Sequence, residues 1–238
     1  MLTQRRLIPL PDGREIDVLT TGPEDGFPLV VHGGTPGGLV VDSRIAAAAA
    51  DRGLRFVLTA RPGYEGSTPR VGRRVRDVAA DVAGVLDALG VGAFVSIGMS
   101  GGGPHSLACA ALLPGRCLAA ASVAGVGPYL ADGLDFLAGM GPENVTEFGL
   151  AVRGAAALTP YLAFAADWGF SLDTLAERAA IWQGDQDRMV PYAHGQWLAA
   201  HIPGARVHLE PGAGHVTMVV TAIDRILDDL LDLAGLPR

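Results

Sequence analysis

The chain has 238 residues and a formal net charge of −7, and all 18 of its basic residues are arginine. This acidic balance predicts neither a basic nucleic-acid footprint nor a polybasic membrane patch. Hydrophobic residues make up 49% of the chain, which at this length predicts one domain with a large buried core rather than a disordered polypeptide.

The two cysteines, Cys109 and Cys117, form neither a disulfide framework nor a metal-ligand pattern, and we expect buried thiols. Residues 1–6 lack the apolar region of a signal peptide, and no apolar stretch reaches the ~18 residues of a membrane span. The sequence therefore predicts a cytoplasmic protein that needs no metal or cofactor and binds neither a membrane nor a nucleic acid. A homo-oligomer is compatible with the sequence.

Alternating polar and apolar residues predict an opening hairpin, with strands at about 5–10 and 15–20 around Asp12-Gly13. Strands and helices then alternate, which is typical of a mainly parallel sheet with helices on both faces and active loops at the carboxyl ends of the strands. The expected elements are a central strand Pro28–His32, a strand Arg55–Thr59, an amphipathic helix Val75–Leu89, strands Phe94–Gly98, Ala119–Ala124, Ala179–Trp182 and Arg206–Leu209, and a helix Thr221–Leu233.

A G-x-S-x-G pentapeptide, Gly98–Gly102, follows the strand that begins at Phe94 and precedes a helical segment. This is the setting of a nucleophile elbow, in which a serine occupies a strained turn between a strand and a helix. Glycine is needed on both sides because a Cβ atom there would collide with the neighbouring strand or helix. Ser100 is the predicted nucleophile.

The predicted acid and base follow later strands. Enzymes with this elbow supply their groups in the order Ser, Asp or Glu, His, each at the end of a strand. Asp187 lies in the loop after the strand 179–182, and His215 lies in a glycine loop after the strand that ends at Leu209. We assign Asp187 as the acid and His215 as the base. Asp185 is the alternative acid, and one of the two carboxylates only forms the turn.

The glycine-rich loop Gly33–Gly38 follows the central strand and exposes backbone N–H groups. One of these, with the N–H of Gly101 at the start of the helix after the elbow, would bind a developing oxyanion. Which residue is the loop donor depends on the residue from which its position is counted. Counted from Pro36 the donor is Thr35, and counted from the pair His32-Gly33 it is Gly34.

With these motifs the chain resembles the α/β-hydrolase superfamily, in the branch of small esterases, cofactor-free haloperoxidases and proline iminopeptidases. The resemblance implies an α/β-hydrolase fold, with one domain over residues 1–238 and a short cap insertion at about 126–176. Two positions depart from relatives, which often carry Asp at Ala60 and a small residue at Glu65. The matching motifs are His32–Pro36, Arg61–Tyr64, the elbow, Gly184–Pro191 and Gly214-His215.

The expected cap is rich in aromatic residues. Tyr129, Trp168 and Phe170 are the rings that we expect to bind an apolar acyl or aromatic group. Alternatively, the rings form only the core of the cap. The segment is short, which predicts a shallow pocket and an open Ser100. Seven of the 14 aromatic residues lie in it: Tyr129, Phe136, Phe148, Tyr161, Phe164, Trp168 and Phe170.

Three functions are compatible with these residues, and each involves a small molecule. The first is a metal-independent serine hydrolase that cleaves carboxylic esters of small apolar or aromatic acyl groups through an acyl-serine intermediate. The second is a proline iminopeptidase-like aminopeptidase, and the third is a non-hydrolytic ligand receptor that retains the triad. An aminopeptidase would need cap carboxylates to hold a free α-amine, for which the candidates are Asp132, Asp135, Glu143 and Glu147.

Overall fold

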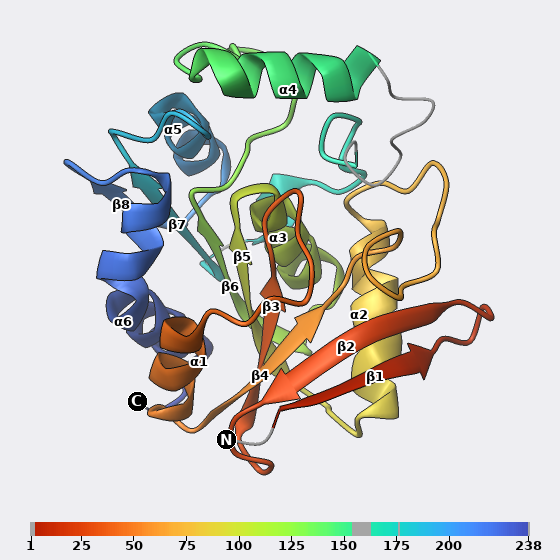
Figure 1. The fold of residues 1–238 in the computed structure, drawn as a ribbon. Coiled ribbons are helices and arrows are strands. Elements are labelled where there is room, and N and C mark those ends of the chain that lie inside the picture. The colour runs from red at the N-terminus through yellow and green to blue at the C-terminus, as the bar shows by residue number, and fades with distance from the viewer. Residues whose placement is uncertain (1–2, 154–162, 176, 238) are drawn as a thin grey trace.

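The computed structural model describes residues 3–153, 163–175 and 177–237. Among these residues a sheet of eight strands passes through the centre of the molecule (Figure 1). The strands are β1 (Gln4–Pro9), β2 (Glu15–Thr21), β3 (Phe27–His32), β4 (Leu54–Thr59), β5 (Phe94–Met99), β6 (Cys117–Val123), β7 (Ala179–Gly184) and β8 (Arg206–Glu210).

The strand order is β1-β2-β4-β3-β5-β6-β7-β8. The pairs β1–β2 and β2–β4 are antiparallel, and each of the other neighbouring pairs is parallel. The predicted hairpin and the predicted parallel sheet are therefore both confirmed. β5 lies between β3 and β6, and five of its six residues are buried because helices cover both faces of a parallel sheet.

Helices pack on both faces of the sheet, as the sequence predicts (Figure 1). α1 (Ser43–Ala50) and α6 (His215–Ala234) lie together on one face. On the other face lie α2 (Asp77–Ala88), α3 (Gly103–Leu112) and α5 (Tyr192–His201). Each face has its own apolar core, and each fully buried Leu or Ile side chain in it contributes about 1.5–3 kcal/mol.

The last helix begins earlier than the sequence predicts, at His215 instead of Thr221. Four of the six residues before Thr221 are β-branched, which lowers the helix propensity of this segment and obscured the start. In the structure Thr217 Oγ1 accepts a hydrogen bond of 2.7 Å from the N–H of Gly214, and Met218 is buried. Capping and core packing thus extend the helix. The predicted apolar face is confirmed, since its residues are all buried: Ile223, Ile226, Leu227, Leu230 and Leu231.

α4 (Pro142–Arg153) lies apart from the helices that cover the sheet, beyond the carboxyl ends of the parallel strands (Figure 1). A short 3-10 helix, η2 (Leu172–Leu175), packs against α3. Both belong to the segment in which we expect a cap. Residues 154–162 and 176, including Tyr161, lie outside the described residues. The single domain with a cap at about 126–176 stays a prediction.

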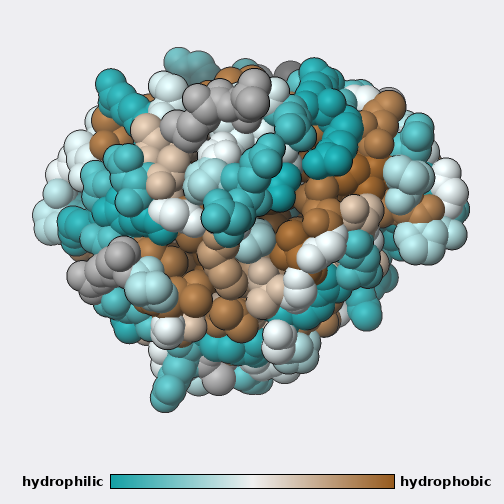
Figure 2. Space-filling view, turned by 90° about the horizontal axis from the view of Figure 1, so that it is seen from below, coloured by the Kyte–Doolittle hydropathy of each residue, from teal (hydrophilic) through white to brown (hydrophobic). Residues whose placement is uncertain are grey.

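The end of the molecule opposite α4 has both apolar and hydrophilic residues on its surface. Figure 2 shows apolar residues gathered in the middle of this face with hydrophilic residues around them. Within the residues that the structure describes, no helix has the length and apolar character that crossing a membrane requires.

Candidate active site

The turn around Ser100 has the geometry of an elbow. β5 passes directly into a 3-10 turn, η1 (Ser100–Gly102), and then into α3. Ser100 has a φ of 55°, in the left-handed region that non-glycine residues rarely adopt. A Cβ atom on Gly98 would overlap the carbonyl oxygen of Gly102, and one on Gly102 would overlap that of His32 in β3. Both flanking positions therefore require glycine, as expected.

The buried carboxylate of Asp187 is hydrogen-bonded to the partly buried ring of His215. Asp187 Oδ1 accepts hydrogen bonds of 2.8 Å from the backbone N–H groups of Met189 and Val190. Asp187 Oδ2 lies 3.2 Å from Gln183 Nε2 and 2.7 Å from His215 Nδ1. Because a carboxylate only accepts, the proton of the short bond is on Nδ1 of His215. Nε2 is then the nitrogen that can exchange a proton with a substrate or a nucleophile.

Asp185, the alternative acid, has different partners. Its Oδ1 accepts hydrogen bonds from the N–H of Gly212, at 2.8 Å, and from Gln186 Nε2, at 3.1 Å. Its side chain thereby joins the loop after β7 to the loop after β8. Asp185 thus has the contacts of a turn-forming residue.

The three predicted triad residues all follow the carboxyl ends of parallel strands, namely β5 for Ser100, β7 for Asp187 and β8 for His215. Within the described part of the chain, Ser100 Oγ makes no hydrogen bond to His215. Catalytic hydrogen bonds are often long in ligand-free proteins and shorten when the substrate binds.

The glycine loop after β3 lies against the elbow. A Cβ atom on Gly34 would lie 3.4 Å from Ser100 Cβ and 3.8 Å from Ser100 Oγ. Thr35 lies against Gly101, where a Cβ atom would be 2.9 Å from the Cβ of Thr35. The structure therefore brings Gly34, Thr35 and Gly101 together beside Ser100. Both loop donors that the sequence leaves open are at the elbow.

The buried side chain of His105 contacts the backbone of the elbow. His105 Nδ1 lies 3.0 Å from the carbonyl oxygen of Gly101, and His105 Nε2 lies 3.3 Å from Arg73 Nη1. Arginine only donates, so Nε2 accepts and Nδ1 donates to Gly101. Burial, helped by the charges of Arg61 and Arg73, holds the pKa of His105 well below its ordinary value. A neutral ring therefore fixes the Gly101 peptide, a role that the sequence did not indicate.

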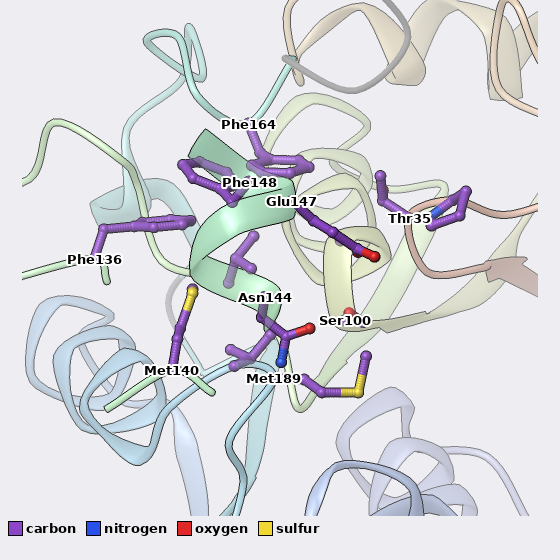
Figure 3. Close-up of a pocket in the computed structure, with 13 residues that line it drawn as sticks. Thr35, Ser100, Phe136, Met140, Asn144, Glu147, Phe148, Phe164 and Met189 are labelled. Carbon is purple, nitrogen blue, oxygen red and sulfur yellow. The ribbon is translucent and has the colours of Figure 1, made fainter. Parts of the chain in front are cut away.

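A cavity of about 220 Å³ opens at Ser100, between the elbow and α4 (Figure 3). Its wall is mostly apolar, and Figure 3 shows the carboxylate end of Glu147 directed toward the side where Thr35 and Ser100 lie. The described lining residues are Thr35, Pro36, Ser100, Gly101, Val126, Phe136, Met140, Asn144, Glu147, Phe148, Phe164, Met189 and Val190.

The three rings that we expected to bind substrate do not line this cavity. Trp168 is buried, its Nε1 donates to the carbonyl oxygen of Phe164 at 3.2 Å, and Phe170 stacks on it. Tyr129 packs behind the wall, with ring centroids 5.2 Å from Phe136 and 5.4 Å from Phe148. The expectation is corrected, because aromatic composition does not show which side of a segment a ring occupies.

The residues that do line the cavity have a regular spacing that our sequence analysis did not use. Met140, Asn144, Glu147 and Phe148 recur at intervals of three or four residues, so they share one side of a helix. In the structure, Met140 precedes α4 and the other three belong to it. Among the residues described, no group of three or more His, Cys, Asp or Glu side chains could hold a metal ion.

The two cysteines lie away from this chemistry. Cys109 and Cys117 are buried free thiols, as expected. Burial raises the pKa of both thiols, which keeps them protonated.

Comparisons with known proteins agree with this architecture. A family model described as "alpha/beta hydrolase fold" matches residues 28–163. Among solved structures, a hydrolase from Pseudomonas aeruginosa is 20% identical with a TM-score of 0.70, and 98% of each chain is covered. An esterase from Rhodococcus sp. is 22% identical with a TM-score of 0.70, covering 96% of this chain and 99% of that one. Naproxen esterase from Bacillus subtilis is 16% identical with a TM-score of 0.66, covering 98% and 91%. The search of curated proteins finds no match.

Proposed function

Because the chain belongs to the α/β-hydrolase fold family, we propose that it is a serine hydrolase that cleaves carboxylic esters of small apolar or aromatic acyl groups. The observation that carries the proposal is the hydrogen-bonded Asp187–His215 pair at the same carboxyl end of the sheet as Ser100, which has a positive φ and lines an apolar cavity. Two of the solved structures with this fold are named as esterases.

In the proposed acylation step, Ser100 Oγ attacks the ester carbonyl carbon while His215 Nε2 takes the hydroxyl proton. Asp187 keeps the other nitrogen protonated and stabilises the imidazolium. The oxyanion receives hydrogen bonds from Gly101 N–H and from the N–H of Gly34 or Thr35. When the tetrahedral intermediate collapses, His215 gives its proton to the departing alkoxide, and an acyl-Ser100 ester remains.

In deacylation a water molecule takes the place of the alcohol. His215 Nε2 removes a proton from the water as its oxygen attacks the acyl carbon. The same proton returns to Ser100 Oγ when the carbon–oxygen bond to serine breaks. The products are a carboxylic acid and the free enzyme. A fluorophosphonate probe followed by a panel of p-nitrophenyl esters tests the whole proposal, because labelling requires the activated serine and turnover requires all three groups.

The size and lining of the cavity support the choice of acyl group. About 220 Å³ is below the range of a drug-sized ligand site, so a short chain or one ring fits best. The phenylalanine and methionine side chains would bury the acyl group and offer it no charge partner. Apart from Thr35 and the elbow, the polar residues among the described residues that line the cavity are Glu147 and Asn144.

Phe148→Ala should raise KM for p-nitrophenyl butyrate about fivefold and change kcat less than about twofold. The ring lines the cavity, so its loss removes apolar contact that exists in both ground state and transition state. Steady-state kinetics across acyl lengths measure the effect, which should grow with acyl length.

Trp168→Ala is the matched control, because Trp168 is buried outside the cavity. It should lower the free energy of unfolding by about 3–5 kcal/mol without changing KM in the folded enzyme. If Trp168→Ala raises KM and Phe148→Ala leaves it unchanged, the acyl group binds elsewhere.

One observation favours the aminopeptidase as a second candidate. Of the four cap carboxylates, only Glu147 lines the cavity within the described residues, and its carboxylate is directed into it (Figure 3). A carboxylate there could pair with the free α-amine of an aminoacyl substrate. Asp132, Asp135 and Glu143 do not line the cavity.

Glu147→Gln decides between the two substrates. For an esterase, the substitution should change kcat/KM for p-nitrophenyl butyrate less than about threefold, because that substrate carries no charge. For an aminopeptidase, the wild type should prefer aminoacyl anilides, and the substitution should reduce kcat/KM for them about tenfold or more. Glu143→Gln, on the same helix but outside the cavity, is the control.

A further inference from the structure

Arg61 is a buried cation beside the elbow. It lies just after β4 and is 5% exposed, and within the described residues it forms no ion pair with a carboxylate. Burial lowers the pKa of its guanidinium from the ordinary value. Burying an unpaired charge is costly, and such a group persists where its hydrogen bonds are needed. Its partners therefore indicate its role.

Those partners are backbone carbonyls of the glycine loop. Arg61 Nη1 donates to the carbonyl oxygen of Gly33 and Nη2 to that of Gly34, both at 2.6 Å. Nη2 also lies 3.2 Å from Thr35 Oγ1. The guanidinium carbon lies 5.3 Å from the ring centroid of Tyr64, which covers the cation. A planar fork thus holds two successive peptide units at once.

The two carbonyls belong to the peptide units that carry the candidate oxyanion donors. The carbonyl of Gly33 shares its unit with the N–H of Gly34, and the carbonyl of Gly34 shares its unit with the N–H of Thr35. In a trans peptide the C=O and N–H bonds point in opposite directions. Fastening both carbonyls to Arg61 therefore turns both N–H groups away from Arg61.

These N–H groups are available beside the nucleophile. Neither donates a hydrogen bond to another residue in the described part of the chain. Gly34 borders Ser100, since a Cβ atom on it would lie 3.4 Å from Ser100 Cβ. A hydrogen bond from a cation to a carbonyl also polarises the peptide unit, which makes its N–H a stronger donor.

We propose that Arg61 is a positioning residue for the oxyanion hole, whose guanidinium orients and polarises the Gly33–Gly34 and Gly34–Thr35 peptide units toward the oxyanion that forms at Ser100. This inference rests on the proposed serine hydrolase function. Arg61 does not touch the substrate, so it acts only through the loop. Its effect belongs to the transition state, where the negative charge develops, and not to substrate binding.

Arg61→Lys is the informative variant, because it keeps the positive charge and loses the two-pronged fork. It should lower kcat for p-nitrophenyl butyrate about 10- to 100-fold and change KM less than about threefold. Affinity for a trifluoromethyl ketone, which forms a tetrahedral adduct with the serine, should fall by the same factor as kcat/KM. In Arg61→Gln, which loses the charge as well, kcat should fall by at least the same factor.

Arg52→Lys is the matched control. Arg52 is also a largely buried arginine with several partners. It donates hydrogen bonds of 2.7 Å to Asp228 Oδ1 and of 3.0 Å to the carbonyl oxygen of Ala48. It joins α1 to α6, away from the elbow. The control should lower the melting temperature without changing kcat. If Arg61→Lys has wild-type kcat, or changes only KM, the proposal is wrong.

Backbone amide NMR separates this inference from the proposed function. The amide proton signals of Gly34 and Thr35 should shift in Arg61→Lys relative to the wild type, because their peptide units lose the fork that orients and polarises them, whereas the signal of Gly101 should not change. If the wild type hydrolyses no ester but Arg61→Lys shifts these two signals, the function fails and the loop clamp stands. Unchanged signals of Gly34 and Thr35 overturn the clamp. If the Arg61 variants do not fold, scalar coupling in the wild type between the guanidinium nitrogens and the carbonyl carbons of Gly33 and Gly34 decides, and its absence overturns the clamp.

Discussion

Ser100→Ala should reduce kcat for p-nitrophenyl esters about 10⁶-fold, because a nucleophile and its base act as a unit. The fold should persist, since serine and alanine have similar strain at the φ of 55° and Ser100 Oγ has no hydrogen bond to lose within the described residues. The measurements are initial rates on purified protein and a thermal melt beside the wild type.

The variant should also lose covalent labelling by a fluorophosphonate probe. Contaminating esterases are the main risk, so labelling and turnover must be followed on the same preparation. Turnover by Ser100→Ala at the wild-type rate would show that the elbow does not supply the nucleophile. A wild type that neither reacts with the probe nor hydrolyses any ester, while binding small apolar molecules, would support the receptor instead.

Asp187→Asn should reduce kcat about 10⁴-fold, far more than Asp185→Asn. The amide oxygen will stay at the position of Oδ1, where Met189 and Val190 donate their N–H groups. The amide nitrogen then faces Nδ1 of His215, which must give up its proton to accept a hydrogen bond. The proton moves to Nε2, and His215 no longer acts as a base toward Ser100.

Asp185→Asn is the control, because its amide oxygen can still accept the hydrogen bond from the N–H of Gly212. Its kcat should change less than about threefold. His215→Ala should match the loss in Ser100→Ala, since both remove a member of the same proton-transfer pair. If Asp185→Asn is the more damaging of the two carboxylate variants, the acid has been assigned to the wrong residue.

The sequence was sufficient to predict the sheet, its parallel character and the order of the elements. The reason is that these depend on local patterns: mostly apolar runs for strands such as β5, and the helical spacing of apolar residues in α6. The elbow was also predictable, because overlap at Gly98 and Gly102 restricts those positions to glycine. The order of Ser100, Asp187 and His215 along the chain is read directly from the sequence, and each residue follows a predicted strand.

The tertiary structure alone decided which side chains meet. The rings that line the cavity are Phe136, Phe148 and Phe164 and not Trp168 or Phe170, because the side of a segment that faces the cavity depends on how α4 packs over the sheet. The contacts of Arg61 with Gly33 and Gly34 join residues 27 and 28 positions apart. No local pattern encodes such a contact, since it arises only when β3 and β4 pair and their loops meet at the same edge. The sequence by itself thus determined the fold and the order of the candidate catalytic groups, and packing between distant segments determined the pocket and the contacts of the glycine loop.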